Sequence, residues 1–137
     1  MLLVCRFVVV PAEEPAFTAR ARRALELLTA APGCLGGEFG RAVDDPQRWV
    51  LTVRFVSVDA YRRALSPFPV REHVVPLLSE ALADEPAGYE TLLRGEAGAV
   101  RAHESMLTGD RPATARPVRD GNLDVGGVSL PSLRPPE

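Results

Sequence analysis

Few side chains in this sequence can carry acid–base or nucleophilic chemistry near neutral pH. The chain has two histidines, His73 in an apolar helical stretch and His103 in a stretch rich in glycine and proline. Histidine is the side chain whose ordinary pKa lies closest to neutrality. All sixteen basic residues are arginine, which excludes a lysine Schiff base. Cys5 and Cys34 do not have the spacing of metal ligands, so no metal site is expected.

The element most clearly defined by its pattern is a strand over residues 49–56. Aromatic and β-branched residues fill it, Asp44-Asp45-Pro46 precedes it as a turn, and Ser57 after it begins a helix. Alternate side chains of a strand point to opposite faces, and here both faces are largely apolar. Each face therefore needs a covering layer.

The remaining pattern predicts an α+β fold with one domain over residues 1–95. The further predicted elements are strand 2–10, helix 13–31, strand 35–43, a short helix after Ser57, helix 70–83 kinked at Pro76, and strand 89–94. This order is the ferredoxin-like βαββαβ arrangement, which gives a four-stranded antiparallel sheet ordered 4-1-3-2 with both helical segments on one face. Residues 96–137 form a Gly/Pro-rich tail, expected to be extended or partly disordered.

The two faces of this sheet differ in character. One face collects the large apolar side chains and is assigned to the helices: Leu3, Cys5, Phe7, Phe39, Trp49, Leu51, Val53, Phe55 and Leu93. The other face carries several valines together with Glu90, Arg6, Arg54 and Glu38, which in sheet order form a cross-strand charge ladder. Because one layer of helices covers only one face, the second face is expected to be the interface of a homodimer.

Composition excludes several other partners. The net charge is -2, with 16 basic and 18 acidic residues and no block of one sign, so no nucleic-acid partner is expected. No apolar run approaches the roughly 20 residues that span a bilayer, so no membrane partner is expected either. Two cysteines on strands too far apart to form a bridge indicate free thiols and a reducing cytoplasm.

Several short motifs resemble the antibiotic biosynthesis monooxygenase (ABM) domain family over about residues 1–95. They are Phe17, Pro32-Gly33, Asp45-Pro46 before Arg48-Trp49, Phe55-Val56-Ser57 with Tyr61 following, and Asp84-Glu85-Pro86. The resemblance implies a dimeric α+β barrel in which the sheets of two ferredoxin-like subunits face each other. It also implies a pocket within each subunit, between the sheet and the helices.

This resemblance assigns roles to particular residues. Substrate-binding side chains would be Trp49, Phe7, Phe55 and Phe39 on the sheet, with Phe68 in the helical roof. The catalytic set would be His73 as base, Tyr61 as hydrogen-bond donor and Arg62, or its neighbour Arg63, as the cation that holds a phenolate. Haem-degrading members place an iron-ligating histidine near His73, but they also need an asparagine and a tryptophan where this chain has Arg6-Phe7 and Arg62-Arg63.

The predicted function is therefore a cofactor-independent monooxygenase or tailoring enzyme. Its substrate would be a small hydrophobic aromatic molecule, polyketide-like or a quinol, and no cofactor is expected. Two alternatives stay open on the same fold: a dimeric barrel that binds a small ligand without catalysis, and a polyketide cyclase-type enzyme.

Overall fold

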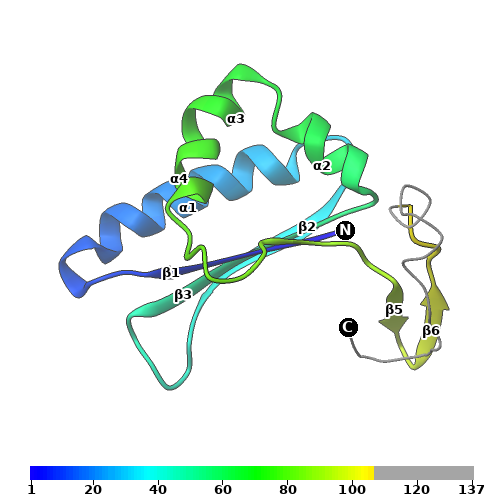
Figure 1. The fold of residues 1–137 in the computed structure, drawn as a ribbon. Helices are drawn as coiled ribbons and strands as arrows, with labels where there is room; N and C mark the ends of the chain where they lie inside the picture. Colours follow the sequence, from blue (N-terminus) through cyan, green and yellow to red (C-terminus); the bar gives the residue numbers. More distant parts are fainter. Residues whose placement is uncertain (107–137) are drawn as a thin grey trace. The chain divides into compact units, whose positions relative to one another are not determined.

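The computed structural model describes residues 1–106, of which Met1–Arg101 form one compact unit. The elements are β1 (Leu2–Val8), the 3-10 turn η1 (Pro11–Glu13), α1 (Glu14–Thr29), β2 (Cys34–Arg41), β3 (Arg48–Phe55), α2 (Val58–Ala64), α3 (Phe68–His73), α4 (Val75–Ser79), β4 (Gly88–Tyr89), β5 (Leu93–Glu96) and β6 (Ala99–Ala102) (Figure 1). From residue 107 onward the predicted tail lies outside the described residues. The boundary at residue 95 stays a prediction.

The main sheet has four antiparallel strands in the order β2-β3-β1-β4. This is the predicted order 4-1-3-2 read from the other edge, and the ferredoxin-like fold class is confirmed. β1 and β3 pair along their whole length, from Leu2 opposite Arg54 to Val8 opposite Arg48. β2 pairs with the other side of β3, with a register shift between Cys34 and Gly36, and forms one edge of the sheet.

Helices α1 to α4 cover a single face of this sheet (Figure 1). The face predicted from strand alternation is the covered one, because Cys5 on β1 and Val53 on β3 are buried with their neighbours on that side. The buried core consists of Leu3, Cys5, Phe7, Leu51, Val53 and Phe55 from the sheet and Phe17, Ala21, Ala24, Leu28, Ala60, Ala64, Val70, Val74 and Leu77 from the helices. Burial of each larger apolar side chain contributes about 1.5–3 kcal/mol to folding.

The predicted helix 70–83 is two short helices instead of one kinked helix. α3 ends at His73, Val74 lies between the two with φ -100° and ψ -50°, and α4 begins at Val75. Pro76 has no N–H to donate to the carbonyl of Glu72, and its fixed φ suits the first turn of a new helix. The predicted single helix with a kink at Pro76 and an end at residue 83 is therefore wrong: the break lies at Val74, two residues before Pro76, and α4 ends at Ser79.

The predicted fourth strand, residues 89–94, is mostly absent from the main sheet. Only Gly88 and Tyr89 form β4, although the amide of Val4 also donates to the carbonyl of Ala87 (2.7 Å). Residues 93–96 instead form β5, which pairs with β6 as a separate two-stranded sheet. The turn between them is Ala97-Gly98, where φ is 53° and 83°. Two successive positive φ values are what a tight hairpin turn requires.

The uncovered face of the sheet carries charge in a different arrangement from the predicted ladder. Glu38 lies opposite Thr52, whereas Arg54 lies opposite Gly36 and donates a hydrogen bond to the carbonyl of Leu35 (3.4 Å). Arg6 forms ion pairs with Asp84 (3.5 Å) and Glu85 (3.6 Å), which precede β4. The predicted pairing of Arg54 with Glu38 is therefore wrong, because the register of the β2–β3 pair places Glu38 two residues away from the position opposite Arg54. Val8 and Val56 remain 49% and 60% exposed on this face.

Candidate functional site

A continuous group of aromatic rings lies between the sheet and α1. Phe7 meets Phe17 edge to face with ring centroids 4.9 Å apart, Phe17 lies 5.9 Å from Phe39, and Phe39 stacks on Trp49 at 5.1 Å. The guanidinium of Arg41 lies over the Trp49 ring, 5.2 Å from its centroid. The structure thus brings Phe7, Phe39 and Trp49 together in one aromatic group, and their role in substrate binding stays a prediction.

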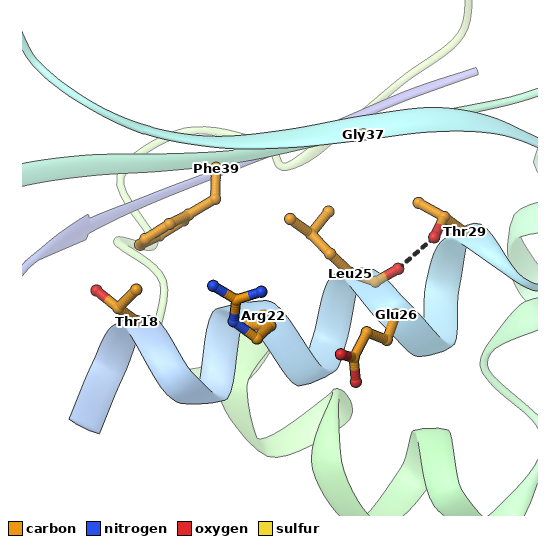
Figure 2. Close-up of a pocket in the computed structure, with 7 residues that line it drawn as sticks. All are labelled: Thr18, Arg22, Leu25, Glu26, Thr29, Gly37 and Phe39. Carbon is orange, nitrogen blue, oxygen red and sulfur yellow. Dashed lines mark hydrogen bonds between the residues drawn. The ribbon is translucent and has the colours of Figure 1, made fainter. Parts of the chain in front are cut away.

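A hollow of about 430 Å³ opens between α1 and β2 beside this aromatic group. Its lining comes from one side of α1 and from the facing strand (Figure 2): Thr18, Arg22, Leu25, Glu26, Thr29, Gly37 and Phe39. This volume lies in the range of pockets that bind small molecules, roughly 300–1,000 Å³. The position, between sheet and helix, is the one that the sequence predicts for a pocket.

Gly37 lets its neighbours on α1 and β3 lie close to the β2 backbone. A Cβ atom at Gly37 would lie 2.8 Å from the carbonyl oxygen of Thr52 and 3.0 Å from a methyl carbon of Leu25. The first distance is shorter than real contacts and the second is tight, so a side chain at this position would force the β2 and β3 backbones or the Leu25 side chain to shift. Leu25 thus packs directly against the β2 backbone and forms the apolar wall of the hollow.

The polar groups of the hollow have different partners. The hydroxyl of Thr29 donates to the carbonyl of Leu25 (2.6 Å), and the carboxylate of Glu26 pairs with Arg23 (3.3 Å) and points away from β2. Arg22 extends from α1 into the gap beside the ring of Phe39 (Figure 2). The hollow thus combines the cation of Arg22 and the carboxylate of Glu26, which is paired with Arg23, with an aromatic ring and an aliphatic wall.

Phe55 and Tyr61 form a second aromatic pair, with ring centroids 5.5 Å apart and planes at 60°. Neither residue lines the α1–β2 hollow. Burial raises the pKa of the Tyr61 phenol, and the nearby Cys5 thiol raises it further. A phenol in this state keeps its proton, so Tyr61 is suited to donate a hydrogen bond.

The other predicted site residues lie on the outer surfaces of the helices. The His73 side chain is 46% exposed, pairs with Glu72 (3.4 Å) and lines a different hollow of about 270 Å³ together with Arg20 and Arg23. Arg62 is exposed and pairs with Asp59 (3.9 Å), and Phe68 is 65% exposed. The structure does not bring His73, Tyr61 and Arg62 together around the α1–β2 hollow. Their catalytic roles stay predictions.

Of the residues that line the hollow, only Phe39 is a predicted site residue, and Thr18, Arg22 and Gly37 are among those that escape prediction from the sequence. The helical period contains a signal for the first two. Thr18, Arg22, Leu25 and Thr29 recur at helical spacing and run beside the buried stripe of Phe17, Ala21, Ala24 and Leu28. A polar stripe that flanks a buried one lies at the margin of the helix–sheet contact, where a pocket opens.

The described part of the chain offers little for metal or redox chemistry. No group of three or more His, Cys, Asp or Glu side chains within residues 1–106 is placed to hold a metal ion. Cys5 and Cys34 are both free thiols, as predicted, and burial raises the pKa of Cys5 to about 11. Within the same residues, no helix combines the length and the apolar character needed to cross a membrane.

The topology and the hollow define the class of protein: a ferredoxin-like α+β domain with a ligand-sized space between sheet and helices. Residues 1–67 match the family model for antibiotic biosynthesis monooxygenase, which confirms the predicted family over this part of the chain. No curated protein matches the sequence significantly.

Solved structures share the fold. The cofactor-independent oxygenase SnoaB from Streptomyces nogalater superposes with a TM-score of 0.51 at 25% identity, over 59% of this chain and 82% of that one. A conserved protein from Methanosarcina mazei Go1 superposes with a TM-score of 0.52 at 19% identity, over 61% of this chain and 82% of that one. A proposed antibiotic biosynthesis monooxygenase from Nitrosomonas europaea superposes with a TM-score of 0.50 at 17% identity, over 61% of this chain and 87% of that one.

Proposed function

We propose that this protein is an ABM-type oxygenase that oxidises a small aromatic substrate held in the α1–β2 hollow. The observation that carries the proposal is the hollow itself, whose volume suits a two- or three-ring molecule and whose strand side presents the ring of Phe39. The match to the ABM family and the likeness to a cofactor-independent oxygenase support the reaction type.

The proposed reaction needs no external reductant. A ring methylene flanked by phenolic groups, as in an anthrone, loses two C–H bonds and gains a C=O bond, while O₂ supplies one oxygen to the carbonyl and leaves the other as water. This oxidation removes four electrons from carbon, and O₂ takes up four. Ionisation of the substrate to an electron-rich phenolate starts the sequence, and the protein contributes orientation and partial exclusion of water.

Oxygen uptake by the purified chain tests this proposal. We expect uptake with an anthrone or hydroquinone panel, without added flavin or metal, and at least a tenfold loss in Phe39→Ala, whose ring would no longer support the substrate. Phe68→Ala is the matched control, because that ring is exposed and lies outside the hollow. Absence of uptake with every member of the panel would contradict the proposal.

His73→Ala decides the predicted base role in the same assay. His73 lines the other hollow, so we expect uptake within about twofold of the wild type, with the phenolic proton leaving to solvent. A loss above tenfold, in a variant with an unchanged melting temperature, would instead assign the base role to His73.

Simple ligand carriage is the second candidate. The observation in its favour is that none of the three predicted catalytic side chains lines the α1–β2 hollow. It predicts binding of the same aromatic panel, measured by calorimetry, without oxygen uptake.

We also propose that the chain forms a homodimer through the uncovered face of the sheet. Val8 and Val56 expose apolar surface there, and the helices occupy the opposite face. Covering such a face with a second copy removes this surface from water, and each Å² of apolar area buried contributes about 25 cal/mol.

A further inference from the structure

We propose that Arg22 anchors a carboxylate, so that the ligand of the α1–β2 hollow is a planar aromatic acid. This inference rests on the proposed function, in which the hollow holds an aromatic molecule, and it adds the chemical class of that molecule. The juxtaposition that carries it is a guanidinium that has no ion pair among residues 1–106 and lies beside an aromatic ring in a ligand-sized space.

The acidic residues near Arg22 pair with other arginines of α1. Arg20 is held by Glu80 through two hydrogen bonds of 3.1 and 2.6 Å, and Arg23 is held by Glu26 at 3.3 Å. Glu26 is one turn after Arg22 and is the natural partner for it, but its carboxylate points to the other side of the helix (Figure 2). Within residues 1–106, Arg22 has no acidic side chain within ion-pair distance.

Arg22 is an exposed side chain that lies beside apolar walls. Leu25 and Phe39 form apolar walls of the same hollow, and a charged hydrogen bond is stronger beside such walls than on a flat, hydrated surface. A guanidinium presents a planar fork of donors that matches the two oxygens of a carboxylate. A flat ring can stack on the Phe39 ring. Arg22 and Phe39 together would therefore bind an aromatic ring that carries an acidic group at one end.

Calorimetry with a matched pair of ligands tests the anchor. The full chain is titrated at pH 7 with 2-naphthoate and with its neutral isostere, 2-naphthamide. We expect the acid to bind at least tenfold more tightly than the amide, the size of effect that one charged hydrogen-bonded pair produces. Raising the salt concentration should weaken the binding of the acid and leave the binding of the amide unchanged.

Three variants assign the preference to Arg22. Arg22→Gln should bind acid and amide equally, with amide affinity within twofold of the wild type, and Arg22→Lys should keep part of the preference because it retains charge without the fork. Arg71→Gln is the control: it removes the same charge from an exposed position on α3, which lies outside the hollow, and should keep the full preference.

The outcomes separate the two proposals. Equal binding of acid and amide to the wild type, or a preference that survives in Arg22→Gln, would overturn the anchor and leave the hollow as an aromatic site. Binding of neither ligand, or binding of both that is unaffected by Phe39→Ala, would overturn the aromatic site and the anchor with it.

Discussion

The ring of Phe39 lies nearly parallel to the indole of Trp49, with centroids 5.1 Å apart and planes 11° apart. Trp49 is the single tryptophan of the chain, and its Nε1 is buried without a hydrogen-bond partner within the described residues. Phe39 also lines the α1–β2 hollow, so the fluorescence of Trp49 reports on the wall of the candidate site.

Replacing Phe39 with leucine should therefore change both stability and fluorescence. The substitution removes the stacked ring from a partly buried position, and we expect a loss of about 1–2 kcal/mol in the free energy of unfolding with a shift in Trp49 emission. Urea titration followed by circular dichroism and fluorescence measures both. Phe68→Leu, at an exposed ring, should cost less than about 0.5 kcal/mol and leave the emission unchanged, and equal effects at the two sites would contradict the packing described.

Two glycines of β2 should respond in opposite ways to a methyl group. Gly37→Ala places Cβ 2.8 Å from the Thr52 carbonyl oxygen, which belongs to the paired strand and cannot move freely, so we expect a loss of about 1–3 kcal/mol. Gly40→Ala meets no atom within 4 Å and should be neutral or slightly stabilising. Urea midpoints of the two variants check the contrast. A Gly37→Ala variant as stable as Gly40→Ala would contradict the close approach of the Thr52 carbonyl to Gly37.

The proposed dimer should be sensitive to charge on the uncovered sheet face. Val56→Glu would bury an unpaired carboxylate in the interface, so we expect sedimentation to change from a dimer mass to a monomer mass. Val43→Glu is the control, because Val43 is fully exposed in the connection between β2 and β3 and should leave the dimer intact. A monomeric wild-type chain would refute the proposed interface directly.

Cys5 should make stability depend on pH in the alkaline range. Burial raises the pKa of its thiol from an ordinary value of 9.0 to about 11, so the folded state retains a proton that the unfolded state loses. The contribution of the Cys5 thiol to stability is present below pH 9 and is lost as the pH rises toward 11. The free energy of unfolding should therefore fall across this window. Cys5→Ala should show a shallower fall in urea titrations at pH 8.5, 10 and 11. An identical slope would contradict the assignment to Cys5.

Strand alternation was sufficient to predict the sheet, because its signal is local and repeated. Cys5 between Leu3 and Phe7, and Val53 between Leu51 and Phe55, identify the same buried face, and the order of elements then leaves one simple topology. The fourth strand could not be predicted in the same way. The hairpin that begins at residue 93 depends on a positive φ at Ala97. Alanine rarely adopts this conformation, so the sequence does not signal the turn.

One residue that lines the hollow, Phe39, is also a predicted site residue. Large aromatic residues on a strand signal burial, which is why the sequence places Phe39 and Trp49 on the covered face of the sheet. Arg22 was not expected, because an arginine on an exposed helix side has the same sequence pattern whether it faces water or a hollow. Two relationships distinguish Arg22: Gly37 lies on the facing strand, and Glu26 pairs with Arg23 instead of with Arg22. Both involve pairs of residues that the pattern of one helix does not reveal.

The place of β2 at the margin of the sheet also has a kinetic consequence. A molecule that reaches the hollow along this strand passes the exposed side chains of Thr18 and Arg22 and needs no part of the core to open. Association should then proceed at the rate of encounter, without a slow gating step, and differences in affinity among ligands should arise from how long each one stays bound.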